Sequence, residues 1–341
     1  MKQQVTLGMI AILFFIAIFF LLNLLLGSVN IPARSVIRIL LGNPENEVWQ
    51  NIIFKSRLPQ AMTAVVAGAG LAVSGLQMQT VFRNPLAGPS VLGISAGASL
   101  GVAFVVLLSG SIGGAALSTW GVMGEFALTI SAIVGALCIM SLLVMASQKV
   151  SGSVSLLIMG VMIGYVANAI IGVFKFFSSE EDIRHYVVWG LGSFGRVSGG
   201  QVTTFVVIML VLLPVSMLLV KTLNLMLLGD AYASNLGLNI RRARTQVIIC
   251  SGVLVAIVTA YCGPISFLGL AVPHLCRYLF HTSDHRILMP ASVLVGAALA
   301  LFCNLVARLP GFEGALPVNS VTALIGAPIV LSVLLKRNRK K

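Results

Sequence analysis

Long apolar stretches, each about the length of a membrane span, recur along most of the chain. A bilayer core of about 30 Å requires a helix of about 20 largely apolar residues. Ten stretches fit this description: residues 7–26, 58–80, 90–108, 122–146, 154–177, 202–220, 244–261, 265–281, 287–307 and 317–335. The 265–281 stretch is the weakest, because Pro273 interrupts it. The pattern predicts an all-α, polytopic membrane protein with about ten transmembrane helices in one bundle.

The stretches between these spans are short and show no linker or low-complexity segment. We therefore expect residues 1–341 to form a single transmembrane domain. The longest outer segments are 27–57 and 178–201, and the first contains an amphipathic stretch, IPARSVIRILLG. On the inner side, the charged loop 221–243 stands out.

A short sequence echo links two distant parts of the chain. Residues 88–94 read GPSVLGI and residues 263–270 read GPISFLGL, each just after an apolar span. The ten-span topology puts the first copy inside and the second outside, as an inverted repeat would. Chance alone could produce so short a match in a chain with 34 glycines.

Composition and charge support a membrane location and indicate an orientation. The chain is 58% hydrophobic and 9% charged, whereas a soluble domain carries roughly 25% charged residues. Of the 22 Lys and Arg residues, 14 fall in the predicted inner segments, where Asp230 and Asp284 are the only acids. This is the positive-inside bias, and it predicts cytoplasmic N- and C-termini. The net charge of +13 therefore indicates orientation in a lipid bilayer, and we expect no nucleic-acid partner.

Two absences from the sequence narrow the source of energy for transport. No glycine is followed by lysine, so the sequence lacks a GxxxxGK[ST] phosphate loop. Glu125, Lys175 and Arg308 lie near the outer ends of spans, and His274 lies in the interrupted 265–281 stretch. No confidently placed span carries an ionisable residue near its middle, where ion-coupled carriers usually keep one. Two possibilities are left: a separate ATPase subunit supplies the energy, or the protein is a passive channel.

Five motifs carry a family resemblance over essentially the whole chain. They are RLPQAMTAVVAGAGLAVSGLQMQTVFRNPLAGPSVLGISAGAS at 57–99, LLGDAYASNLGLNIRRAR at 227–244, GPISFLGLAVPHLCRYL at 263–279, DHRILMP at 284–290 and ALPVNSVTALIGAPIVL at 315–331. The chain resembles the FecCD-type permeases, the membrane subunits of ABC importers for ferric siderophores, haem and vitamin B12.

The resemblance implies a fold, partners and a location. The fold would be a type II ABC importer permease of ten helices, with an inverted repeat of helices 2–5 and 7–10. It would form a homodimer in the bacterial cytoplasmic (inner) membrane, with two ATPase subunits on the cytoplasmic side and a substrate-binding protein outside. We expect the chain to be a transporter subunit and not an enzyme. It would carry no cofactor of its own, since the partner ATPase would bind ATP and Mg.

The inner loop 221–243 contains a candidate coupling segment. Gly229 and Gly237 bracket about two helical turns, which taken alone suit either a solvated connector or a knob for a partner's cleft. The resemblance implies that this segment docks on the ATPase, through positions that match the family pattern: Gly229, Asp230, Ala233, Leu236 and Gly237. Gly237 is expected to end the short helix with a positive φ.

The fifth predicted span carries a candidate wall of the translocation path. Gly160, Gly164, Asn168 and Gly172 recur every four residues, which places small and polar groups on one helix face. Such a face permits close helix packing. The resemblance implies instead a wall of the path, and a wide path with few charges suits a bulky chelate.

Two arginines at outer span ends are candidates for docking the binding protein. Arg57 opens the RLP motif and Arg308 closes the ninth span. The resemblance implies that both pair with acidic residues of the binding protein, while the alternative is that both extend to the lipid headgroups. Gln60 stands where many relatives carry a second basic residue.

Three histidines, His274, His281 and His285, fall within twelve residues. They lie toward the inner end, beyond a path for intact chelates, so we expect no metal site; Asp284 is instead expected to cap the next helix. The prediction for the whole chain is a permease that moves an iron complex into the cytoplasm, a ferric siderophore first, with haem or cobalamin as other candidates. An ion-coupled secondary transporter of a small solute is the alternative.

Overall fold

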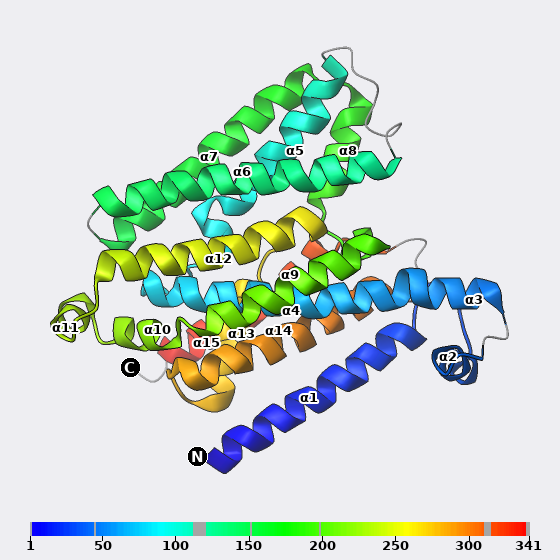
Figure 1. Ribbon diagram of the computed structural model, residues 1–341, viewed down its shortest axis with the longest axis horizontal. Helices are drawn as coiled ribbons and strands as arrows, with labels where there is room; N and C mark the ends of the chain where they lie inside the picture. Colours follow the sequence, from blue (N-terminus) through cyan, green and yellow to red (C-terminus); the bar gives the residue numbers. More distant parts are fainter. Residues whose placement is uncertain are drawn as a thin grey trace.

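The computed structural model describes residues 2–43, 46–111, 121–150, 152–197, 199–309 and 315–338. Over these residues the chain is helical and connected by short turns (Figure 1). The α-helices are α1 (Lys2–Leu25), α2 (Ala33–Leu40), α3 (Glu47–Ile52), α4 (Leu58–Val81), α5 (Ile94–Ser111), α6 (Gly121–Lys149), α7 (Ser153–Phe177), α8 (Glu180–Gly190), α9 (Gly200–Met217), α10 (Val220–Leu227), α11 (Asp230–Asn235), α12 (Ile240–Cys262), α13 (Leu268–Phe280), α14 (His285–Ala307) and α15 (Val318–Asn338). A π-helical turn, η1 (Ile53–Arg57), joins α3 to α4, and 3-10 turns form η2 (Pro89–Leu92) and η4 (Phe194–Arg196).

Each of the ten predicted spans contains a helix, which confirms the all-α membrane fold. Within the described ranges, seven helices are long and apolar enough to cross a membrane: α1, α3–η1–α4 taken together, α6, α7, α9, α12 and α14. Helices α5 and α15 contain shorter apolar stretches, Ile94–Leu108 and Val318–Ser332. The tenth predicted span, 265–281, contains α13.

Helix α13 accommodates Pro273 but is too short to span a bilayer. Its 13 residues extend about 20 Å at 1.5 Å per residue. The chain before it, from residue 263, is non-helical, with φ of +74° at Gly263 and +66° at Phe267. Non-helical backbone at membrane depth is tolerated when protein buries it, and Ile265 and Leu268 are indeed buried.

The packing of the helices shows the inverted repeat that the short sequence echo suggested. Helices α4, α5, α6 and α7 correspond in order to α12, α13, α14 and α15. The contacts obey this exchange: α4 packs on α14 as α12 packs on α6, and α5 packs on α6 and α7 as α13 packs on α14 and α15. Helices α4 and α12 pack against each other at the centre. Because the end of α4 meets the start of α12, the two run antiparallel, so the repeat is inverted (Figure 1).

The two echoing Gly-Pro segments meet where the halves join. A Cβ atom on Gly269 would lie 2.7 Å from Cδ of Pro89, and one on Gly88 would lie 3.0 Å from Cγ of Leu270. Each segment also contains a left-handed residue just before its helix, Gly93 in the first and Phe267 in the second. The sequence echo therefore marks equivalent structures in the two halves.

Helix α4 forms the centre of the core because its small residues permit close approach. A Cβ atom on Gly296 of α14 would lie 2.5 Å from the carbonyl oxygen of Gly68. On another side of α4, a Cβ atom on Gly75 would clash with the carbonyl oxygen of Gly269. Membrane helices associate through such small-residue contacts, because lipid supplies little hydrophobic drive between helices.

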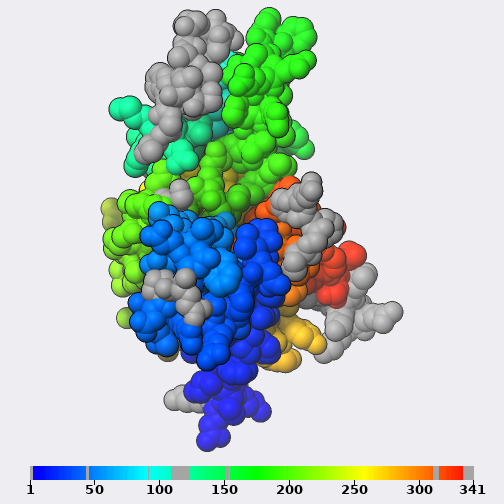
Figure 2. All heavy atoms as spheres, turned by 90° about the vertical axis from the view of Figure 1, so that its right-hand side faces the viewer, coloured from blue at the N-terminus to red at the C-terminus, as the bar shows by residue number. Residues whose placement is uncertain are grey.

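The elements of interest lie at opposite ends of the bundle. In Figure 1 the start of α1 and the coupling segment α11 lie at the left-hand end, and α2 and α3 lie at the right-hand end. Figure 2 looks onto the right-hand end, where the blue chain of α2 and α3 covers the middle of the face. Helix α2 forms within the predicted amphipathic stretch and buries Ser35, Val36 and Ile39.

Candidate functional site

The inner loop forms two short helices, α10 and α11, and α11 ends in a Schellman motif. The amide of Leu238 donates to the carbonyl of Ala233 at 3.0 Å, and the amide of Gly237 donates to the carbonyl of Ser234 at 2.9 Å. Gly237 has φ +88°, which confirms the positive φ expected from the sequence. Gly229 precedes α11 with φ +105°, so both glycines serve the backbone geometry of the segment.

The side chains of α11 divide between the protein and solvent. Ala233 is buried, whereas Tyr232 is 63% and Leu236 is 56% exposed. An exposed apolar pair on a short helix at the end of a bundle is an available contact surface. The structure thus brings the five predicted coupling positions together in one protruding turn.

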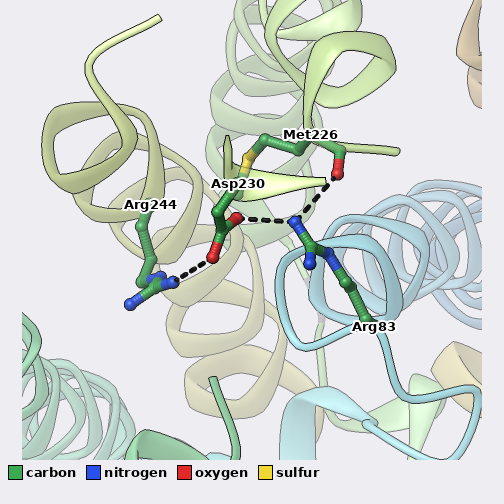
Figure 3. A network of polar contacts seen from close by, with 4 residues as sticks. All are labelled: Arg83, Met226, Asp230 and Arg244. Carbon is green, nitrogen blue, oxygen red and sulfur yellow. Dashed lines mark hydrogen bonds and ion pairs between the residues drawn. The ribbon is translucent and has the colours of Figure 1, made fainter. Parts of the chain in front are cut away.

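Asp230, the first residue of α11, joins this turn to two membrane helices (Figure 3). The Nη2 atom of Arg83, just beyond α4, donates to Oδ1 of Asp230 at 2.6 Å. The Nη2 atom of Arg244, in the first turns of α12, donates to Oδ2 at 3.5 Å. Arg83 Nη2 also donates to the carbonyl of Met226 in α10 at 3.4 Å.

A second polar cluster holds α10 against α4 and α14. The side-chain oxygen of Asn224 accepts from the backbone amide of His285 at 2.9 Å and lies 2.8 Å from Nδ1 of the same residue. The Nε2 atom of His285 lies 2.8 Å from Oγ1 of Thr80 at the end of α4. The amide nitrogen of Asn224 donates to Asp284 at 2.6 Å.

Asp284 is the N-cap of α14, as the sequence predicted, because its Oδ1 accepts from the amide of Arg286 at 2.9 Å. This backbone bond, together with that from Asn224, holds the pKa of the Asp284 carboxyl below its usual range. Of the three histidines, His285 joins α14 to α4 and α10, while His274 Nδ1 lies 2.8 Å from the carbonyl of Leu270 within α13.

At the predicted outer end, Arg57 is buried and bonded to the end of α1. Its side chain is 1% exposed, and Nη1 donates to the carbonyls of Leu24 at 2.7 Å and Leu25 at 2.8 Å. Nη2 donates to the carbonyl of Val29. The last carbonyls of a helix lack intrahelical partners and attract a cation. Arg57 thus closes the C-terminus of α1, and its docking role stays a prediction.

Arg308 is half-buried and borders a cavity of about 270 Å³ that is lined by both polar and apolar residues. Ser28, Ser56, Gln60 and Ser193 also line this cavity. A Cβ atom on Gly27 would lie 2.9 Å from Nη2 of Arg308 and 3.1 Å from Nη2 of Arg57, so both guanidinium groups approach Gly27. Burial and the neighbouring Arg57 charge lower the pKa of Arg308 to about 10, which leaves it charged at neutral pH.

The four-residue pattern of the fifth span does not stay on one face of α7. Gly160 and Gly164 are buried against Leu92 and Gly93 beside η2, whereas Asn168 and Gly172 are exposed. A spacing of four residues advances about 40° per step on a helix of 3.6 residues per turn, so the pattern rotates from the core to the surface. Close packing accounts for the first two positions, and the path role stays a prediction.

Sequence reasoning missed the partners of Asp230 and Asn224. The sequence placed Asp230 among many basic residues on the predicted inner side, but its partners Arg83 and Arg244 come from different spans. The position of Arg83 directly after an apolar span was the available signal. For Asn224 and His285 no local signal exists, because they meet only through tertiary packing.

Comparison with known proteins agrees with this architecture. The FecCD transport family matches residues 14–336. The hemin transport system permease protein HmuU of Yersinia pestis is 34% identical over 326 residues, which cover 94% of each chain. The vitamin B12 import system permease protein BtuC of Klebsiella pneumoniae is 37% identical over 287 residues, covering 84% of this chain and 83% of that protein. A solved metal-chelate type ABC transporter, in an inward-facing conformation, matches with a TM-score of 0.82 and 30% identity, covering 96% of this chain and 98% of that one.

A polytopic helical bundle built as an inverted repeat, with a glycine-bounded helix projecting from one end, defines the membrane-spanning permease subunit of an ABC importer. The similarity extends over nearly the full length of the chain. The chain belongs to the FecCD transport family.

Proposed function

We propose that this permease moves an intact metal chelate from an outer binding protein into the cytoplasm. A ferric siderophore is the first candidate, and haem and cobalamin are the others. The permease acts as a homodimer, and two separate ATPase subunits on the cytoplasmic side supply the energy. The observation that carries the proposal is α11, a short helix with exposed Tyr232 and Leu236 on a chain that lacks a phosphate loop.

The choice of a chelate rests on the matched relatives and on the surface of α7. HmuU and BtuC are named for hemin and vitamin B12, in both of which a large organic ligand encloses a metal. Asn168 and Gly172 expose small, uncharged groups on α7, and such a wall suits a bulky molecule that keeps its own ligand shell. A siderophore ranks first among the candidates on the resemblance to FecCD-type permeases, which include the importers of ferric siderophores.

Arg308 is the stronger candidate for docking the binding protein. It borders a cavity lined in part by Ser28, Ser56, Gln60 and Ser193, and its guanidinium can make bidentate contacts with a carboxylate. Surface charge pairs of this kind mainly steer association and fix its register. Arg57 lies beside it but holds the end of α1, so it contributes directly only if those carbonyl contacts open.

The alternative, an ion-coupled secondary carrier, finds little support in the buried groups. Among the described residues no Asp or Glu is buried, and the buried arginines and histidines are Arg57, Arg244, His274 and His285. A proton- or sodium-coupled carrier usually needs a carboxylate inside the membrane to bind and release the ion.

Uptake into proteoliposomes tests the proposal. The permease is reconstituted with its ATPase and offered radiolabelled ferric siderophore, haem or cobalamin on its binding protein. We expect uptake of one chelate, and this uptake should require ATP enclosed in the lumen of the proteoliposomes. Vanadate should stop it, whereas an ionophore that collapses ion gradients should not. Uptake that continues without ATP and stops with the ionophore would establish the secondary carrier instead.

A further inference from the structure

The carboxylate of Asp230 is shared between two membrane helices that come from different halves of the repeat. One oxygen accepts from Arg83 at 2.6 Å and the other from Arg244 at 3.5 Å (Figure 3). Arg83 follows α4, the first helix of one half, and Arg244 lies in α12, the first helix of the other. The contacts therefore connect α11 with equivalent helices of both halves.

The local backbone is shaped around this arrangement. Arg83 has φ +47°, a left-handed conformation that is unfavourable for a non-glycine residue. Arg244 has only 7% of its side chain exposed, although it carries a charge. A charged side chain that is nearly buried needs partners that satisfy it, and Asp230 supplies one.

The other attachments of α11 to the membrane helices are few. Ala233 is the buried residue among the described residues of α11. A glycine with positive φ lies at each end of the helix. Asp230 and Arg83 are 43% and 44% exposed, and exposed ion pairs of this kind contribute little to the stability of a fold. The pair can therefore orient a short helix without being needed for the fold of the protein.

We propose that Asp230 is a positioning residue whose carboxylate ties the coupling helix α11 to α4 and α12 together, so that displacement of α11 moves both halves of the permease as one. This inference rests on the proposed function, in which α11 meets the ATPase. Asp230 faces the permease's own arginines in this arrangement and leaves Tyr232 and Leu236 for the partner.

Helix α4 connects the contact at Asp230 with the opposite end of the bundle. Helix α4 continues from η1, so one helical segment extends from Glu47 to Val81 and carries Arg57 at its outer part. It packs against α12, α13 and α14 along its buried length. A displacement applied beside Arg83 therefore acts on a rigid, closely packed element and not on a flexible loop.

The experiment compares Asp230→Asn, Asp230→Glu, Arg83→Gln and the double variant Asp230→Asn/Arg83→Gln in the reconstituted complex with ATPase and binding protein. Arg241→Gln is the matched control, because Arg241 is an exposed arginine at the start of the same helix as Arg244. The readouts are the ATPase retained on the permease, the rate of ATP hydrolysis, and chelate transported per ATP hydrolysed.

We expect Asp230→Asn and Arg83→Gln to retain the ATPase and to lower chelate transported per ATP by about fivefold or more, the lower end of typical coupling between sites. The double variant should be no worse than Asp230→Asn alone, since that substitution already removes the pair with Arg83. Asp230→Glu should restore most of the ratio, and Arg241→Gln should leave it unchanged.

Three results would overturn the inference. The first is an unchanged ratio in Asp230→Asn; the second is release of the ATPase by that variant, which would make Asp230 a contact of the partner. The third is additive losses in the double variant. If the unsubstituted complex shows no ATP-driven uptake, the proposed function itself fails, and this outcome is distinct from a failure of the variants.

Discussion

At the scale of single residues, the neighbouring guanidinium groups of Arg57 and Arg308 have different surroundings and therefore different candidate roles. Both approach Gly27, yet Arg57 is 1% exposed and bonded to carbonyls of α1, while Arg308 borders a cavity. Sequence position alone made them equivalent, because each lies at the predicted outer end of a span beside a Leu-Pro pair. Burial distinguishes them, since a guanidinium enclosed by backbone carbonyls cannot also meet a partner's carboxylate.

Two substitutions should separate the docking role of Arg308 from the structural role of Arg57. Arg308→Glu should weaken association with the binding protein, most clearly at low salt where screening is small, and leave thermal stability nearly unchanged. Arg57→Gln should lower the free energy of unfolding by about 1–3 kcal/mol, the cost of unsatisfied buried polar groups. Affinity measured at two salt concentrations and thermal unfolding in detergent test this, with the exposed Lys55→Glu as the charge-matched control. Normal binding by Arg308→Glu at low salt would show that its docking role is wrong.

At the scale of elements, the geometry at the ends of α11 and α13 determines the length and direction of these short helices. Gly237 ends α11 in a Schellman motif at φ +88°, and the short stretch 263–267 leads into α13 through the left-handed Phe267. Apolar length predicted where helices lie, including the one that contains Pro273. It could not predict that α13 has only 13 residues, because an apolar run looks the same whether lipid or protein surrounds it.

Gly237→Val should weaken ATPase association while membrane insertion stays normal. A β-branched residue strains the left-handed conformation by at least about 1–2 kcal/mol, and this would unwind the last turn of α11 where Leu236 is exposed. Gly237→Asn is the control, because asparagine tolerates this conformation. Copurification of the ATPase with each variant is the measurement. Equal recovery with Val and Asn would count against a coupling role for α11.

At the scale of the whole molecule, the inverted repeat places the candidate coupling and docking sites at opposite ends of one central helix pair. Helices α4 and α12 run antiparallel through the core, so the tie at Asp230 and the cap at Arg57 lie at the two ends of α4. The uneven distribution of basic residues predicts which of these ends faces the cytoplasm.

Cysteine labelling should establish this orientation. In a background with the exposed Cys138 replaced by serine, Ser234→Cys in α11 should react with an impermeant maleimide only in inverted vesicles. Glu181→Cys in α8 should react in intact spheroplasts. Both positions are exposed, so accessibility depends on the side of the membrane alone. The opposite labelling pattern would reverse the topology and remove the coupling assignment of α11.

The sequence by itself determined the all-α membrane class, the positions of the ten helices, the cap at Asp284 and the positive φ of Gly237, because apolar length and end signals act over a few residues. Only the tertiary structure decided that Arg57 is buried, that the glycine pattern of α7 turns from core to surface, and that Asp230 joins α4 to α12. These features depend on which helices become neighbours. That choice is made by close packing of small residues such as Gly68 and Gly296, whose partners are more than 200 residues apart in the chain.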